Sequence, residues 1–175
     1  MIIVNNELVA FIAEGNTEQA IIDVLLDHDA LIYTRENVLQ EEVIRCRIGK
    51  KFAKQYLNKS FGSKIHVYRI LDSRVENFIV PKAYQPKISE ITNLTTRPEI
   101  EMLFILLHND YKKYTNGRYK KPSIFVKENY SDLKKVKSYE DNFQFWNSHY
   151  DDLIRVLKQY KSYHQNEATI ADILR

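Results

Sequence analysis

The sequence has a single cysteine, Cys46, in 175 residues, so no disulfide can form within the chain. Cys46 lies in an apolar-alternating segment, residues 43–48, where a buried thiol is the ordinary interpretation and a catalytic thiol is not expected. The five histidines are scattered, and they form neither an HExxH motif nor a Cys/His pair with zinc spacing. We therefore expect neither thiol chemistry nor a zinc site.

Long apolar runs are also missing from the sequence. A membrane-spanning helix needs about 18 or more consecutive apolar residues, and no stretch of the chain reaches that length. The first residues lack the basic, apolar and small-residue pattern of a secretory signal. Without repeats, low-complexity segments or linkers, the sequence predicts a compact cytoplasmic protein. We expect an α/β core in residues 1–115 and a helical extension, packed on that core, in residues 116–175.

The net charge is only +3, so neither sign dominates the chain as a whole. Basic residues nevertheless gather in residues 50–64 and again, with tyrosines interspersed, in residues 112–137. Cations meet phosphates and aromatic rings stack on bases, so the second segment suits a path for nucleic acid along the rim of a site. The alternative is a solvated lysine surface. The nucleic-acid-binding candidates are Lys112, Lys113, Arg118, Lys120 and Lys121.

Residues 8–29, LVAFIAEGNTEQAIIDVLLDHD, are the stretch around which we organise the chain. Their first five residues form an apolar run too short for a helix, which predicts a strand. From Ala20 onwards, apolar residues recur on one face of a 3.6-residue period, which predicts a helix. We expect Asn16 to cap this helix with Gln19 as its capping-box partner, and Glu18 to place negative charge at the positive helix end.

Capping does not explain Glu14, which stands where the strand ends. In an open α/β sheet the carboxyl ends of the strands frame the crevice that binds ligands. Gly15, next to it, predicts either a positive φ or a backbone that comes close to another group. Glu14 is therefore the first candidate for chemistry.

Strands and helices alternate along the rest of the chain, which predicts βαβ units and a mostly parallel sheet. The fold class is therefore α/β, with residues 10–13 and 65–71 in one sheet and their carboxyl ends at the same edge. An aromatic stripe in residues 141–160 is predicted to pack in the core rather than around a cofactor. Further strands are expected at residues 31–33, 43–48 and 88–94, and further helices at residues 50–59, 99–113 and 169–174.

Two segments resemble motifs of Toprim domains, which occur in topoisomerases, bacterial primases, small ribosomal-RNA maturases and nucleases related to the OLD (overcoming lysogenisation defect) family. The first is the strand that ends in Glu14-Gly15 and is followed by Thr17-Glu18 and a helix. The second motif of the family is a strand ending in Asp-x-Asp, and its best match is HVYRILDSR, residues 66–74, in which Asp72 ends the strand. The resemblance covers residues 7–110 and implies a Toprim-like fold.

The same resemblance implies phosphodiester chemistry that depends on Mg²⁺ or Mn²⁺. It gives Glu14 an acid/base role or a metal contact, and it makes Asp72 a metal ligand. Arg74 stands at the second Asp position, where it removes one ligand but offers a guanidinium that can bind the scissile phosphate bidentately. Glu76 and Glu101 are the two candidates to complete the site. For Asp72 the alternative is an exposed turn residue after a strand.

Glu101 is a candidate for a reason of its own. It lies in an otherwise apolar stretch, where an unpaired carboxylate is costly unless it faces a polar cleft, pairs with a cation or binds metal. Glu99 has a simpler explanation as the capping-box acid that partners Thr96 at the start of a helix.

Two hypotheses about function follow. The first is a small metal-dependent Toprim nuclease that cuts DNA or RNA, with bacterial phage defence and a partner protein of a defence system implied by the resemblance. The second is a non-catalytic module with the same fold that binds nucleic acid or a partner protein. The missing second Asp favours the second hypothesis, whereas the Glu14-Gly15 pair favours the first, which we take as the expectation.

Overall fold

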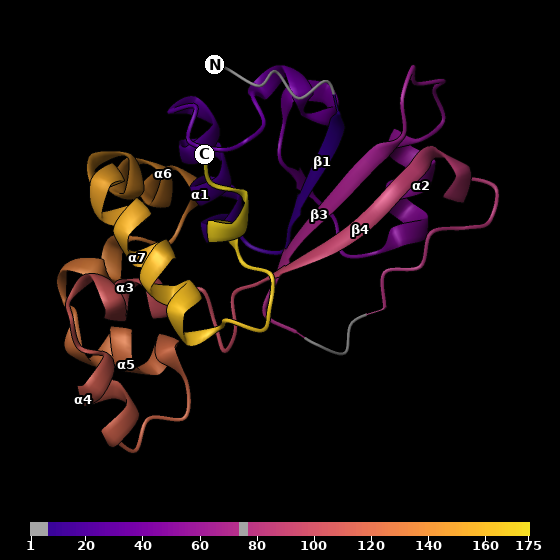
Figure 1. Cartoon of the computed structure of the whole chain (residues 1–175). Helices are drawn as coiled ribbons and strands as arrows, with labels where there is room; N and C mark the ends of the chain where they lie inside the picture. The colour runs from indigo at the N-terminus through magenta and orange to yellow at the C-terminus, as the bar shows by residue number, and fades with distance from the viewer. Residues whose placement is uncertain (1–6, 74–76) are drawn as a thin grey trace.

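The computed structural model describes residues 7–73 and 77–175, so Arg74 and Glu76 lie outside the described residues. Four strands form one sheet in the order β2-β1-β3-β4, and every neighbouring pair is parallel. Figure 1 labels three of them, β1, β3 and β4. The α/β fold class is therefore confirmed: a parallel sheet flanked by helices, with a C-terminal helical region, is consistent with a Toprim-like fold. The strands are β1 (Leu8–Ala13), β2 (Ile44–Arg45), β3 (Ile65–Leu71) and β4 (Ile88–Thr95).

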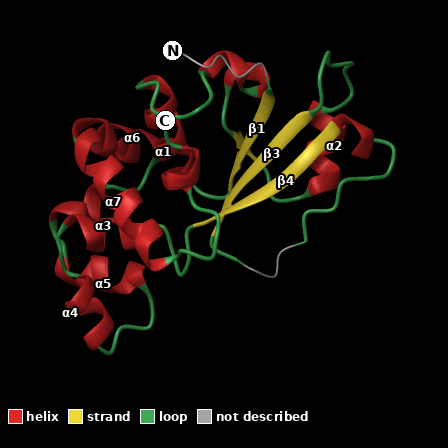
Figure 2. Ribbon diagram, viewed as in Figure 1, coloured by secondary structure: helices red, strands yellow, loops and turns green. Residues whose placement is uncertain are grey.

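Helices cover both faces of the sheet, as Figure 2 shows by colour. One face is covered by α1 and the helices that follow β4, and the other is covered by α2. None of the helices in the described ranges is long and apolar enough to cross a membrane. The helices are α1 (Asn16–Asp27), α2 (Gly49–Tyr56), α3 (Met102–Leu107), α4 (Tyr111–Asn116), α5 (Pro122–Asn129), α6 (Tyr139–Ser148) and α7 (Tyr150–Tyr163), with short 3-10 turns η1 (Arg35–Asn37), η2 (Leu39–Glu41), η3 (Gln85–Lys87), η4 (Asp132–Lys135) and η5 (Ile170–Ile173).

The continuous apolar run of β1 has a simple physical reason. Val9, Phe11 and Ala13 face the core under α1, whereas Ala10 and Ile12 face the core under α2. Because a strand alternates its side chains between two faces, a central strand covered on both sides needs apolar residues throughout.

One of the predicted strands is absent from the sheet, and another is shorter than expected. Residues 31–33 do not join the sheet, because Leu31 bridges to Leu174 and the Ile32 N–H donates to the Ile173 carbonyl at 3.0 Å. Of residues 43–48, only two pair with β1. Cys46 consequently lies beyond the strand and is partly exposed, not buried as predicted.

The helix predicted over residues 99–113 is broken in two. The chain leaves α3 at His108, passes Asn109 in a left-handed conformation with φ of 58°, and starts α4 at Tyr111. Asn tolerates this conformation better than most residues, and the Asp110 carboxylate is held there by the Tyr130 hydroxyl at 2.8 Å. Tertiary contacts thus override the continuous apolar pattern.

The helix predicted over residues 141–160 is also divided, with α6 ending and α7 starting around His149. Its aromatic and apolar stripe is nevertheless core, as predicted, because Trp146, Leu153 and Leu157 are almost fully buried. Of residues 169–174, which were predicted to form a helix, Ile170–Ile173 form only the short 3-10 turn η5.

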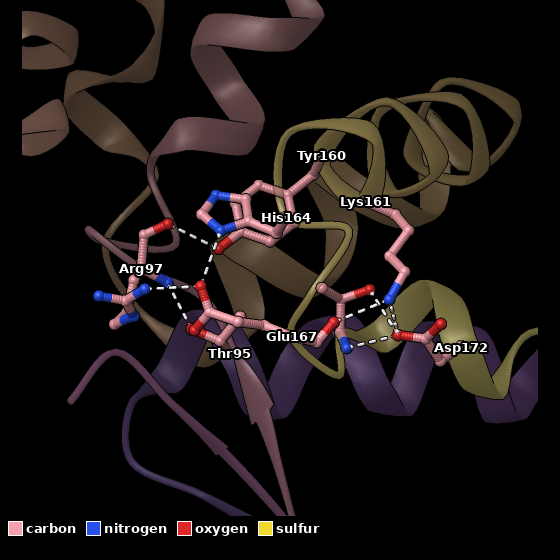
Figure 3. A network of polar contacts seen from close by, with 8 residues as sticks. Thr95, Arg97, Tyr160, Lys161, His164, Glu167 and Asp172 are labelled. Atoms are coloured by element: carbon pink, nitrogen blue, oxygen red, sulfur yellow. Dashed lines mark hydrogen bonds and ion pairs between the residues drawn. The ribbon is translucent and has the colours of Figure 1, made fainter. Parts of the chain in front are cut away.

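The C-terminal segment is fastened to the end of β4 by a polar network (Figure 3). The Arg97 guanidinium contacts the Glu167 carboxylate at 2.6 Å, and the Tyr160 hydroxyl donates to the Arg97 carbonyl at 2.6 Å. The Lys161 ammonium donates to the Glu167 carbonyl at 2.7 Å and to the Asp172 carboxylate at 2.9 Å. These contacts hold α7 and η5 near the end of β4. The helices after residue 116 also share one hydrophobic core with α1 and α3.

Candidate functional site

The direction in which successive strands are added to the sheet changes between β1 and β3. The chain leaves β1 through α1 on one face and returns at β2, and it leaves β2 through α2 on the other face to reach β3 on the far side of β1. A crevice forms at such a switch point, outside the carboxyl ends of the two strands. In the register of the sheet Ala13 is opposite Ile70, so Glu14 and Asp72 leave the same edge from adjacent strands, as predicted.

Arg45 holds the turn that follows β1. Its guanidinium donates to the Glu14 carbonyl at 2.9 Å and to the Asn16 side-chain oxygen at 2.5 Å. The predicted cap is therefore wrong: Gly15 is the N-cap residue, no side chain caps α1, and Gln19 reaches the Val43 carbonyl at 3.4 Å instead. The reason is that β2 brings a guanidinium beside the turn, where it takes the oxygen that would have capped the helix.

Gly15 allows a close approach rather than a positive φ. Its backbone is extended, with φ of −123°. A Cβ atom at this position would collide with the carboxylate oxygen of Glu18, which folds back over the turn. Glycine here makes room for a carboxylate beside the end of β1.

Glu18 is the site residue that sequence analysis missed, because its position in the first turn of α1 had a sufficient explanation in the helix dipole. Its side chain is only 9 % exposed. Burial raises the pKa of the Glu18 carboxyl, and the negative charge of Asp72 raises it further, although its own backbone N–H and the Arg45 and Arg47 cations oppose them. The sequence signal for this role was the small residue, Gly15, placed where the carboxylate turns back.

Glu101 lies at the start of α3 and is half-buried. Burial raises the pKa of its carboxyl, its own backbone N–H lowers it, and the charges of Glu99, Glu18 and Asp72 raise it again. Three elements thus bring acids into mutual electrostatic range: the first turn of α1, the end of β3 and the start of α3. We call Glu18, Asp72 and Glu101 the acidic cluster.

Glu99 does not cap α3, which begins after Glu101 and has no side-chain cap, so its predicted role as the partner of Thr96 is wrong. Its carboxylate accepts the Ser123 N–H at 2.9 Å and lies 3.7 Å from the Lys121 ammonium. The N–H of Ser123 belongs to the first turn of α5, which otherwise has no side-chain cap. Glu99 therefore accepts a free N–H group at the start of α5, a helix that lies beside it only in the folded chain.

A cavity of about 430 Å³ opens next to the acidic cluster. Glu101, Thr17 and Ser123 form its polar wall. Its apolar lining residues, which we call the apolar floor, are Phe104, Val126, Tyr130, Leu133 and Val136. The remaining lining residues, Lys127, Lys134 and Lys137, are exposed and form what we call the lysine rim.

The predicted nucleic-acid-binding residues lie apart from this cavity. Although the structure describes all five of them, none lines it. Lys113 donates to the Asn129 side chain at 2.9 Å and lies over the Phe125 ring, and Lys121 faces Glu99. The lysines that do line the cavity come from the later part of the same basic segment, residues 112–137.

The acidic cluster matches a hard divalent cation in donor type. Mg²⁺ prefers carboxylate oxygens and often takes only one or two of them, keeping waters in its other positions. Burial and mutual repulsion raise the pKa of two of the three acids, and a nearby cation would relieve that repulsion. Within residues 7–73 and 77–175, no three Asp, Glu, His or Cys side chains are grouped so that they could hold a metal ion.

The resemblance to Toprim domains rests on the two sequence motifs at the ends of β1 and β3. Comparison of the chain with protein-family models, with curated proteins and with solved structures finds no match.

Proposed function

We propose that this chain is a Toprim-type, metal-dependent nuclease that cleaves phosphodiester bonds of DNA or RNA. One observation carries the proposal: the acidic cluster lies at the switch point of the sheet and opens beside a cavity with a lysine rim. Carboxylates beside a phosphate need a cation to neutralise charge, and lysines nearby bind the neighbouring phosphates. Bacterial phage defence and a partner protein of a defence system belong to the same proposal, through the resemblance alone.

The roles follow from the position of each acid. Asp72 and Glu101 would offer oxygen atoms to Mg²⁺ or Mn²⁺, and Glu18, which interacts electrostatically with both, would add negative charge beside them. When bound, the cation would polarise the phosphate and favour attack by water. The water oxygen forms a bond to phosphorus while the bond to the leaving oxygen breaks. Glu14, at the end of β1, takes the proton of the water and returns a proton to the leaving oxygen.

The first test is cleavage of labelled single-stranded and duplex DNA and RNA by the purified protein with Mg²⁺, with Mn²⁺ and with EDTA. Glu14→Gln and Asp72→Asn keep the shape of each side chain and remove its charge. We expect each to lower the cleavage rate by a factor of about 10² to 10⁴, the range typical of a lost acid/base group. Both should melt at the wild-type temperature or above it, since the site is crowded with acids.

Glu36→Gln is the matched control, because Glu36 is an exposed acid on η1. It should cleave as the wild type does. A badly destabilised Glu14→Gln protein would instead indicate that Glu14 takes part in a structural ion pair.

The second candidate function is a binding or regulatory module without catalysis. Arg74 at the second Asp position favours it, as does the absence of a three-ligand group among the described residues. A protein that binds nucleic acid but cleaves none with Mg²⁺ or with Mn²⁺ would support this alternative.

A further inference from the structure

We propose that the cavity beside the acidic cluster binds one unstacked nucleotide of a single-stranded DNA or RNA segment, with the base on the apolar floor and the phosphates on the lysine rim. This inference rests on the proposed function, because it names the substrate class of the same site. It adds a requirement that the nuclease proposal does not contain, which is that the nucleotide must be unpaired.

The floor of the cavity suits a base. Tyr130, a floor residue, is fixed in place by its hydrogen bond to Asp110 and by a parallel stack on the His108 ring, with centroids 3.9 Å apart. Phe104 and Leu133 add further buried apolar surface. Aromatic and apolar surfaces bind any base through its flat face, without selecting a sequence. The volume of about 430 Å³ falls in the range of small-ligand sites and admits one nucleotide rather than several.

The lysine rim suits phosphate. Among the described residues, the ammonium groups of Lys127, Lys134 and Lys137 have no ion-pair partner. Lys121, a short distance along the chain, is by contrast turned to Glu99. Three cations that have no ion-pair partner in the described part of the chain lie beside an apolar hollow, and they match a ligand that is flat and apolar at one end and anionic at the other.

A paired base cannot reach the floor. In a duplex the flat faces of each base are covered by its neighbours, so a base must leave the stack before it enters a pocket. Glu101 connects the two parts of the site, because it lines the cavity and also belongs to the acidic cluster. A nucleotide seated on the floor therefore lies beside Glu101, the member of the acidic cluster that lines the cavity.

The test is equilibrium binding, measured by fluorescence anisotropy in EDTA so that no cleavage occurs. The probes are a labelled single-stranded DNA, the RNA of the same sequence and a blunt duplex, with adenosine monophosphate as a competitor. We expect both single strands to bind at least about 10-fold more tightly than the duplex, because stacking on the floor is available only to an unpaired base. The mononucleotide should compete weakly, since it brings one phosphate to a rim of three cations.

Val126→Trp fills the cavity from its floor, and it should weaken single-strand binding by about 10-fold or more while leaving duplex binding unchanged. Its melting temperature is compared with that of the wild type, because Val126 is buried. A second variant tests the inference if Val126→Trp does not fold. It replaces three exposed side chains, Lys127→Gln, Lys134→Gln and Lys137→Gln. It should make the slope of log affinity against log salt shallower by about 2, because each phosphate that a lysine neutralises on a single strand adds roughly 0.7 to that slope.

The matched control makes the same charge change on the other face of the sheet. Lys50, Lys51 and Lys54 are exposed on α2, and their triple glutamine variant should bind single strands as the wild type does. Equal binding of single strand and duplex, or a folded Val126→Trp protein with wild-type affinity, would overturn the inference. So would a mononucleotide that competes as well as a strand.

The two proposals fail in different ways. If the cavity variants lose single-strand binding but the wild type cleaves nothing with either metal, the nucleotide cavity stands and the nuclease is wrong. If the wild type cleaves and the cavity variants cleave single strand and duplex at unchanged rates, the nuclease stands and the nucleotide cavity is wrong.

Discussion

Gly15 shows how one missing side chain shapes the candidate site. Its backbone is one that any residue adopts, so the requirement for glycine comes from the carboxylate of Glu18, which occupies the place of a Cβ atom. That carboxylate is the end of a flexible chain and can move aside. At Gly49 the atoms in the same position belong to the backbone of Ile79, which cannot move so easily.

We therefore expect Gly15→Ala and Gly49→Ala to separate activity from stability. Gly15→Ala should displace the Glu18 carboxylate from the acidic cluster and lower metal-dependent cleavage, with a melting temperature close to that of the wild type. Gly49→Ala should cost about 1–3 kcal/mol, the usual range for an overpacked site, and leave the chemistry of the folded fraction intact. Urea unfolding and cleavage rates measure the two effects. A Gly15→Ala protein with full activity would exclude Glu18 from the site.

The pKa shift of Glu101 also predicts the sign of a stability change. Burial first, and then nearby acids, raise the pKa of its carboxyl above the ordinary value of 4.5 in the folded chain. Between pH 4.5 and the raised pKa of the folded chain, the folded state binds more protons than the unfolded state. Ionisation of this group therefore lowers the stability of the fold as the pH rises through that window.

Glu101→Gln should accordingly be more stable than the wild type at pH 7, and its advantage should shrink as the pH falls toward 4.5. Thermal melts without metal at several pH values measure this difference. Glu128→Gln, an exposed acid on α5, is the control and should show no such trend. A Glu101→Gln protein that is less stable at pH 7 would contradict the assignment of Glu101 to a crowd of like charges.

At the scale of elements, η5 and the last turn of α7 hold the helical region to the sheet. Burial opposes ionisation of Asp172, but the Lys161 ammonium and the Thr169 N–H, at 2.9 and 2.7 Å, outweigh it. Together they hold the pKa of the Asp172 carboxyl below its ordinary value of 3.8. Its stabilising effect is therefore complete above that value and is lost as the pH falls through the lower folded pKa.

We expect Asp172→Asn to lower the free energy of unfolding at pH 7 by about 1 kcal/mol. This is the usual contribution of a charged hydrogen bond, reduced because the pair is partly exposed to solvent. The difference from the wild type should vanish in acid, below the folded pKa. Asp152→Asn on α7 is the matched control, since its ion pair with Arg155 is nearly half exposed on both sides. It should change stability little, and equal effects of the two variants would argue against a fastening role for η5.

At the scale of the whole molecule, the helices after residue 116 complete the core that α1 begins. α6 packs against α1, and α7 packs against α3. The almost fully buried Trp146 and Leu153 belong to the same apolar cluster as Phe11 of β1. Removing residues 116–175 would therefore expose one whole face of the α/β layer to water.

We expect a chain of residues 1–115 not to fold on its own. Its near-ultraviolet circular dichroism should lack fixed aromatic signals, and it should be digested rapidly by protease. Adding residues 116–175 as a separate peptide should restore part of the folded signal if the two parts meet through apolar surface. A cooperative melt of residues 1–115 alone would show that they form an independent domain.

The sequence by itself determined what depends on neighbours along the chain. The apolar run that ends at Ala13, the helical period after Gly15 and the apolar residues of β3 predicted two parallel strands and the helix between them. Because a strand end is a local feature, Glu14 and Asp72 could be singled out at that stage, and the structure brings both to one edge.

Only the tertiary structure decided the features that depend on distant parts of the chain. Glu18 joins Asp72 and Glu101 because three elements converge, and the Glu99 carboxylate accepts an N–H of α5 rather than capping α3. The cavity takes its lysines from α5, from η4 and from the segment after η4, and no periodicity along the chain marks which lysines those are. Burial, charge crowding and competition for hydrogen bonds are set by distances in space, and a pattern of neighbouring residues does not contain those distances.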